Sequence, residues 1–234
     1  MTSGRIAIVG HRGAAGVVPE NTLKGFRYAI DLGVDCVECD VHLTRDSHLV
    51  VMHDETVDRT TNGSGSIHEI DVAAIRALDA GDGEQVPTLD EVLAVVQGKV
   101  QLLCELKGEG VEEATVETVV ARGMEGEVVF TSFDMRRIAK VKGLGDHLLT
   151  GAILVDPEDE EIKRVVDTGV VGIGVYYKNL CLRAVERALD AGIDIRAWNP
   201  DTLREQQAMI ALGVNGVSTN RPDILIEYLH SFMT

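Results

Sequence analysis

Ionisable side chains gather in three short segments within the first 61 residues of the chain. The segments are HRGAAGVVPENT (11–22), ECDVHLTRD (38–46) and MHDETVDRTT (52–61), and each follows or ends a short apolar run. Histidine donates or accepts a proton near neutral pH, and clustered carboxylates favour a cation. Parallel α/β barrels gather such residues where their strands end. The pattern therefore predicts an active site that combines proton transfer with a charged centre.

Three carboxylates are the candidates for a metal site. Glu38 and Asp40 are two residues apart on an expected strand, so their side chains point to the same face. Glu105 lies on the next barrel strand, two residues before Lys107. Carboxylates clustered away from water repel one another unless a cation lies between them, and oxygen ligands favour Mg²⁺ or Ca²⁺. A structural salt network with Arg12 and Lys107 is the alternative, but three acids at strand ends favour a divalent cation.

Two histidines are the candidates for acid–base catalysis. His11 ends the first expected strand and His53 follows the second, so the two imidazoles can straddle a bound group. The role of His42 stays open. Arg12 offers a planar fork for phosphate oxygens. Trp198, the single tryptophan, ends a later strand, where it is expected to form a wall against the carbon skeleton of a substrate rather than to fill the core.

Alternating strand and helix patterns must position these residues. Eight short apolar runs begin near residues 5, 35, 100, 127, 148, 170, 193 and 214, and helical patterns follow them. Eight repeats of strand and helix in 234 residues predict a TIM (β/α)8 barrel. Glycine in a left-handed cap is expected at the ends of five helices. These glycines are Gly33, Gly123, Gly169, Gly192 and Gly213.

One segment interrupts the alternation. Residues 54–87, which follow the second strand, are polar and rich in glycine, and the segment is long for a loop between a strand and a helix. Because it directly follows His53, it is expected to be a short insertion on the catalytic face that shapes the pocket. A surface excursion without a contact role is the alternative. We therefore expect residues 1–234 to form a single domain with one insertion.

The charge balance limits the partners. The chain has 22 Lys and Arg against 38 Asp and Glu, a net charge of −16, which repels nucleic acid and anionic membranes. No apolar run is long enough to span a bilayer, and the first residues lack the features of a signal peptide. We expect a cytoplasmic protein that acts on a small molecule, with a homo-oligomer left open.

Cys36 and Cys39 form a C-x-x-C sequence, which is typical of redox and zinc sites. Side chains alternate between the faces of a strand, so this spacing points the two sulfurs in opposite directions. No second cysteine pair or histidine pair has the spacing of zinc ligands. Buried, reduced thiols are therefore expected.

Taken together, the segments resemble glycerophosphodiester phosphodiesterases. The resemblance rests on HRG followed by PENT, the E-x-D pair, HD-x-x-x-D-R-T-T, PTLDEVL and the ELK strand, and it extends over essentially the whole chain. It implies a TIM barrel with a small insertion and metal-dependent hydrolysis of glycerophosphodiesters to glycerol 3-phosphate and an alcohol. Carried over residue by residue, it implies catalytic His11 and His53, metal ligands Glu38, Asp40 and Glu105, and phosphate contacts from Arg12 and Lys107.

The sequence departs from the family at one place and leaves two other functions to weigh. Trp198 is followed by Asn199-Pro200-Asp201, where the family usually has Thr-Val-Asn, and the difference bears on the preferred head group. A phospholipase D-like enzyme of the same barrel type needs an apolar or membrane-facing rim, which neither the charge nor the insertion provides. A non-catalytic barrel that binds a phosphate metabolite should have lost at least one candidate catalytic or metal-binding residue, and all are present.

Overall fold

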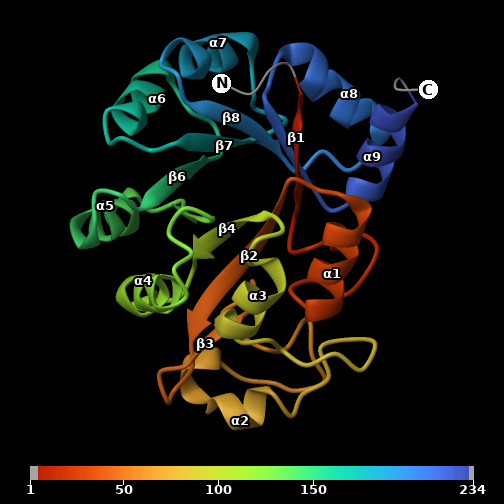
Figure 1. Ribbon diagram of the computed structural model, residues 1–234, viewed down its shortest axis with the longest axis vertical. Helices are drawn as coiled ribbons and strands as arrows, with labels where there is room; N and C mark the ends of the chain where they lie inside the picture. Colours follow the sequence, from red (N-terminus) through yellow and green to blue (C-terminus); the bar gives the residue numbers. More distant parts are fainter. Residues whose placement is uncertain (1–4, 232–234) are drawn as a thin grey trace.

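Eight parallel strands close into a barrel in the computed structural model, which describes residues 5–231. Around the ring the order is β1-β9-β8-β7-β6-β5-β4-β2, and β1 pairs with β2 to close it. The helices surround the strands (Figure 1), so the predicted TIM barrel is confirmed. The barrel strands are β1 Ala7–Gly10, β2 Cys36–Leu43, β4 Gln101–Leu106, β5 Val128–Ser132, β6 Leu149–Leu154, β7 Gly172–Tyr176, β8 Asp194–Trp198 and β9 Gly216–Thr219.

Helices cover the outside of the barrel, and local sequence sets their ends. Thr88 and Thr202 each begin a helix with a capping box. All five glycines expected at helix ends have a positive φ, between 65° and 94°. Within residues 5–231, no helix is long and apolar enough to cross a membrane. The covering helices are α1 Leu23–Leu32, α3 Leu89–Val96, α4 Val111–Ala121, α5 Met135–Leu144, α6 Asp159–Val166, α7 Leu182–Asp190, α8 Leu203–Leu212 and α9 Pro222–His230.

Strand β2 shows how side-chain alternation separates the core from the site. Cys39 faces outward and pairs in register with Cys104 within the large apolar core beneath the helices. Cys36 belongs to a small apolar cluster inside the barrel. The two sulfurs of the C-x-x-C sequence therefore lie on opposite faces, as expected, and all four cysteines are free. The same alternation directs Glu38 and Asp40 into the barrel.

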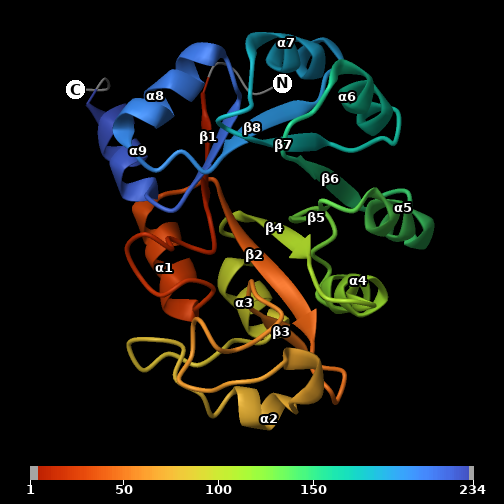
Figure 2. The same ribbon diagram turned by 180° about the vertical axis from the view of Figure 1, so that it is seen from behind.

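The insertion forms a small unit beside the barrel. Strand β3 (Leu49–Val51) runs antiparallel to β2 and leads into η1 (Ile67–Glu69) and α2 (Val72–Ile75). This unit lies at one end of the longest axis of the molecule, beyond the ring of strands (Figures 1 and 2). It has an apolar cluster of its own, separate from the main core. The buried members of this cluster are Val50, Met52, Val57, Ile67, Ile75, Ala80 and Val86.

Candidate active site

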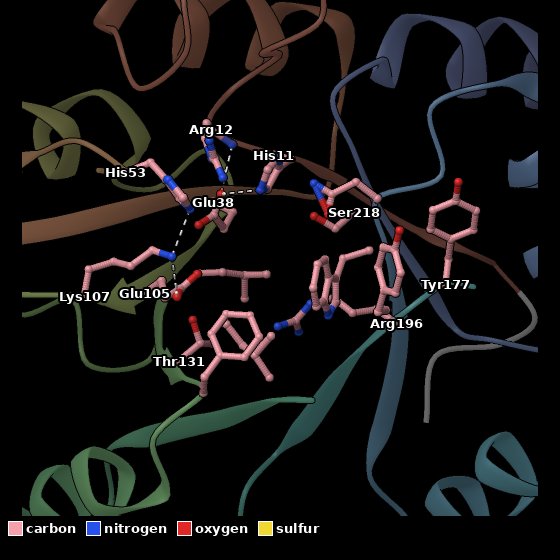
Figure 3. Close-up of a pocket in the computed structure, with 16 residues that line it drawn as sticks. His11, Arg12, Glu38, His53, Glu105, Lys107, Thr131, Tyr177, Arg196 and Ser218 are labelled. Carbon is pink, nitrogen blue, oxygen red and sulfur yellow. Dashed lines mark hydrogen bonds and ion pairs between the residues drawn. The ribbon is translucent and has the colours of Figure 1, made fainter. Parts of the chain in front are cut away.

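A cavity of about 520 Å³ opens where the barrel strands end. Charged groups from β1, β2 and β4 face aromatic side chains from the opposite part of the ring (Figure 3). Asp40 is buried beside Arg12 and Lys107, within reach of both cations. The other sequence-predicted site residues all line the cavity: His11, Arg12, Glu38, His53, Glu105, Lys107 and Trp198.

Three carboxylates meet at one side of this cavity. Glu38, Asp40 and Glu105 each place a carboxylate oxygen within 4.8 Å of the others. Asp40 and Glu105 are direct neighbours in the register of β2 and β4. Within residues 5–231, Glu38 Oε1 and Asp40 Oδ1 are buried and accept no hydrogen bond. Buried oxygens without a donor are costly, and this all-oxygen set fits a hard divalent cation.

The carboxylates strongly influence one another's protonation. Burial raises the pKa of Glu38 well above its ordinary value, and the neighbouring Asp40 charge raises it further. Burial also raises the pKa of Glu105 to about 7, again with a contribution from Asp40. Metal binding requires deprotonated carboxylates, so a cation entering this cluster would displace protons near neutral pH.

The salt network considered as the alternative to a metal site is also present. Lys107 Nζ lies 3.0 Å from Glu105 Oε1, and Arg12 Nε lies 3.4 Å from Asp40 Oδ2. The backbone N–H of Arg12 donates to Glu38 Oε2 at 2.9 Å, with Arg12 in the left-handed region at a φ of 49°. This network still leaves the two orphaned oxygens unsatisfied. The salt network therefore positions the three carboxylates but does not take the place of a bound cation.

His11 is held in one orientation by an amide. Its Nδ1 lies 2.6 Å from Asn220 Oδ1, and its Nε2 lies 3.8 Å from Glu38 Oε2. Burial lowers the pKa of His11 to about 4, and the charge of Arg12 lowers it further. The imidazole is therefore neutral at pH 7. Because the amide oxygen accepts from Nδ1, the lone pair is on Nε2, beside the carboxylates.

Asp201 fixes this amide. Its Oδ2 accepts from Asn220 Nδ2 at 2.7 Å, and its Oδ1 accepts from the Asn220 backbone N–H at 2.8 Å. The side chain of Thr219 donates to the same Oδ1 at 3.0 Å. The Asn199-Pro200-Asp201 departure is thus tied to the position of His11. This role was not predicted from the sequence, because the contact depends on how the loops after β8 and β9 fold and not on the order of the strands.

His53 has a carboxylate where His11 has an amide. Its Nδ1 lies 2.7 Å from Asp54 Oδ1, and its Nε2 lies 3.0 Å from Lys107 Nζ. A hydrogen bond from Arg59 holds the pKa of Asp54 well below its usual range. A carboxylate on Nδ1 stabilises a protonated imidazole. His42, whose role the sequence left open, lies with its Nε2 3.2 Å from the backbone oxygen of His53.

The insertion contributes to the site indirectly. None of residues 54–87 lines the cavity, so the expectation that the insertion shapes the pocket wall is wrong. Instead, Arg59 donates to Asp54 at 2.7 Å and to Glu20 at 2.8 and 2.9 Å. Glu20 also accepts from Arg12 at 3.0 Å. One arginine of the insertion therefore braces the groups that hold both His53 and Arg12.

Aromatic rings form the opposite wall. Trp198 stands edge-on to Phe133, with ring centroids 5.7 Å apart, and lies 5.1 Å from Tyr176. Arg196 also lines the cavity, and the sequence analysis missed it. The signal was available: Arg196 is two residues after Asp194 and two before Trp198 on the same strand, so the Arg196 and Trp198 side chains point to the same face, into the barrel.

Comparison with known proteins agrees with this geometry. The sequence pattern of the glycerophosphoryl diester phosphodiesterase family matches residues 11–224. The chain belongs to this family. A glycerophosphodiester phosphodiesterase of Caldanaerobacter subterraneus subsp. tengcongensis is 35% identical to it in an alignment of 236 positions. The alignment covers 94% of this chain and 96% of that protein.

A second relative and a solved structure extend the match to the family. A glycerophosphodiester phosphodiesterase of Bacillus subtilis is 32% identical over 253 residues, covering 94% of this chain and 85% of that protein. The structure of an Oleispira antarctica phosphodiesterase, in complex with the product sn-glycerol-3-phosphate, superposes with a TM-score of 0.89 at 26% identity and covers 98% of both chains. The resemblance seen in the sequence is confirmed, and the chain is a member of a family of phosphodiester-hydrolysing enzymes.

Proposed function

We propose that the protein hydrolyses glycerophosphodiesters to sn-glycerol 3-phosphate and an alcohol, with a divalent cation held by Glu38, Asp40 and Glu105. The observation that carries the proposal is that Glu38 Oε1 and Asp40 Oδ1 are buried without a hydrogen bond in the described part of the chain, in a cluster whose three carboxylates lie within 4.8 Å of one another. The product complex of the Oleispira antarctica relative supports the same reaction class. Mg²⁺ and Ca²⁺ both suit the oxygen ligands.

Positively charged side chains around the carboxylate cluster bind the phosphodiester. A divalent cation held by Glu38, Asp40 and Glu105 would supply positive charge to offset the negative charge that develops on the phosphate oxygens. Arg12 and Lys107 add positive field from the neighbouring strand ends. The aromatic ring of Trp198 provides an apolar surface for the carbon skeleton of the substrate.

The two histidines divide the proton transfers between them. His11 is neutral at pH 7, so its Nε2 takes a proton from the attacking hydroxyl or water. His53 is oriented by Asp54 through its Nδ1, so its Nε2 is assigned the donation of a proton to the departing alkoxide. Without substrate, Lys107 donates to His53 Nε2. When phosphate oxygens bind Lys107, this hydrogen bond is released, and His53 Nε2 can carry the proton that His53 transfers.

The charge of the chain bears on its partners. A net charge of −16 supports a small-molecule substrate in place of nucleic acid or an anionic membrane. The cytoplasmic location and the oligomeric state stay predictions.

Release of glycerol 3-phosphate from glycerophosphocholine tests the function directly. A coupled assay for glycerol 3-phosphate, run with Mg²⁺ or Ca²⁺, should show turnover of this water-soluble diester. Lysophosphatidylcholine should have a much lower kcat/KM, because its acyl chain holds it in a micelle, whereas glycerophosphocholine diffuses freely to the cavity. Equal or higher kcat/KM on the lysolipid would favour the phospholipase D-like alternative. Binding of glycerol 3-phosphate with no turnover of either substrate would favour the non-catalytic barrel.

A further inference from the structure

Arg196 differs from the other cations that line the cavity. Arg12 is hydrogen-bonded to Glu20 and paired with Asp40, and Lys107 contacts Glu105 and His53. Arg196, on β8, makes no hydrogen bond or ion pair within residues 5–231. It is therefore the one cavity-lining cation in the described part of the chain whose charge no protein group directly satisfies.

The barrel is shaped around this side chain. Two glycines flank it on the neighbouring strands, Gly174 on β7 and Gly216 on β9. A Cβ atom at Gly216 would lie 3.0 Å from Arg196 Cβ, and one at Gly174 would lie 3.4 Å from Arg196 Nη2 and 3.3 Å from Trp198 Cδ1. Gly216 therefore leaves room beside the start of the Arg196 side chain, and Gly174 lies beside its guanidinium. Arg196 thus packs beside the aromatic wall inside the barrel.

Arg196 also forms part of the cavity floor. Together with Leu103 it lines both the main cavity and a second cavity of about 320 Å³. The second cavity lies toward the amino ends of the strands, where Ala7 and Gly172 line it. A substrate that fills the main cavity would therefore meet the guanidinium at its inner end. The Arg196 side chain extends from β8 into this space (Figure 3).

An unpaired cation inside a barrel is unfavourable unless a ligand compensates it. Glu38, Asp194 and Glu105 act on Arg196 through space, and a divalent cation bound to Glu38 and Glu105 would cancel two of these three negative charges. The guanidinium stays protonated in spite of burial. In the metal-loaded site Asp194 is then the one carboxylate among the three that still acts on Arg196, and it makes no hydrogen bond or ion pair with it in the described part of the chain, so the N–H donors of the guanidinium are left for an anionic ligand. A planar fork of N–H donors suits carboxylate and phosphate oxygens.

We propose that Arg196 binds an anionic oxygen of the substrate at the inner end of the cavity. The inference rests on the proposed function, because it names a specificity-determining residue of the same site. Two substituents of a glycerophosphodiester have this chemistry: the phosphodiester group itself, or an acid group carried by its alcohol. The effect of removing Arg196 on two matched substrates distinguishes them.

The matched substrates are glycerophosphoglycerol and the diester in which one glycerol is replaced by glycerate. They differ in a single negative charge. Arg196→Met removes the guanidinium and keeps the apolar stem, and Arg196→Lys keeps the charge without the fork. Losing a charge-assisted hydrogen bond should lower kcat/KM by about 10- to 100-fold. A loss on both diesters assigns Arg196 to the phosphodiester, and a loss on the glycerate diester alone assigns it to the acid group.

Equilibrium binding separates this role from a structural one. If Arg196 contacts the phosphodiester group, calorimetry on Mg²⁺-loaded protein should show weaker binding of glycerol 3-phosphate to Arg196→Met. If it contacts the acid group of the alcohol, the binding of glycerate should be weaker. Arg204→Met removes an exposed arginine from α8 and should change neither affinity. If Arg196 only balances the charge of the carboxylates, Arg196→Met will tighten Mg²⁺ binding and leave both anions bound as in the parent protein.

The outcomes keep this inference apart from the proposed function. Unchanged kcat/KM on both diesters, with unchanged binding of both anions, would overturn the role of Arg196 even in an active enzyme. A parent protein that turns over neither diester would overturn the proposed function, while the binding measurements still test Arg196. Should Arg196→Met fail to fold in a thermal melt, Arg196→Lys provides the same comparison, with a smaller loss expected because the charge remains.

Discussion

Replacing His53 with alanine should slow hydrolysis of glycerophosphocholine by about 10²- to 10⁴-fold and slow a p-nitrophenyl diester far less. Choline leaves as a strongly basic alkoxide that needs a proton, whereas p-nitrophenolate leaves without one. His11→Ala should lose most of its activity on both substrates, because the nucleophile needs a general base in either case. Steady-state kinetics on the two diesters measures the difference.

Control variants make the assignment of the histidines specific. Asp54→Asn removes the carboxylate behind His53 and should show the same dependence on leaving group, in a milder form. His68→Ala removes an exposed histidine of the insertion and should leave both rates unchanged. If His11→Ala is the variant that spares the p-nitrophenyl diester, the two roles are reversed. Equal losses on both substrates for both variants would refute any such division.

Chelation of divalent cations should abolish turnover, and added Mg²⁺ or Ca²⁺ should restore it. Asp40→Asn should lower both the metal affinity and the rate severely, since Asp40 belongs to the carboxylate cluster, is the register neighbour of Glu105 and is fully buried. Glu113→Gln, which removes a surface carboxylate paired with Lys140, is the matched control and should retain the parent affinity. Full activity after exhaustive chelation would contradict the assignment of a metal site.

The metal affinity should also depend on pH, with a sign that the structure sets. Burial raises the pKa of Glu105 to about 7, so without metal this carboxyl is mostly protonated below that pH. The apparent affinity should therefore rise between about pH 6 and pH 8 and then level off. Calorimetry in buffers of different ionisation enthalpy should detect proton release on binding near neutral pH. An affinity independent of pH would contradict a raised pKa in this cluster.

The fold was predictable because its signals are local. Apolar runs of strand length followed by helical patterns recur eight times, five of the helices end at a glycine, and each signal can be recognised without knowing the rest of the chain. Glu38 and Asp40 were predictable for the same reason, since alternation along one strand fixes their common direction. The fixed order of strands in a barrel then brings Glu105 alongside them.

Contacts between distant strand ends were harder to predict. Asn220 and Asp201 meet because of how the loops after β8 and β9 fold, and nothing in either segment identifies the other. Arg59 reaches Glu20 across the loop after β1, which a pattern of polar residues does not reveal. Arg196 had a local signal, because it lies two residues before Trp198 on the same strand, and side-chain alternation alone was enough to place it inside the barrel.

The separate apolar cluster of the insertion makes this part of the molecule a cooperative unit of its own. Such units open at a lower free energy than the whole domain. When this unit opens, Arg59 leaves both Asp54 and Glu20, and the supports of His53 and Arg12 are lost together. Heating should therefore inactivate the enzyme before the barrel unfolds. Hydrogen exchange should show amides of residues 55–86 losing protection in step with activity, ahead of those in the barrel strands.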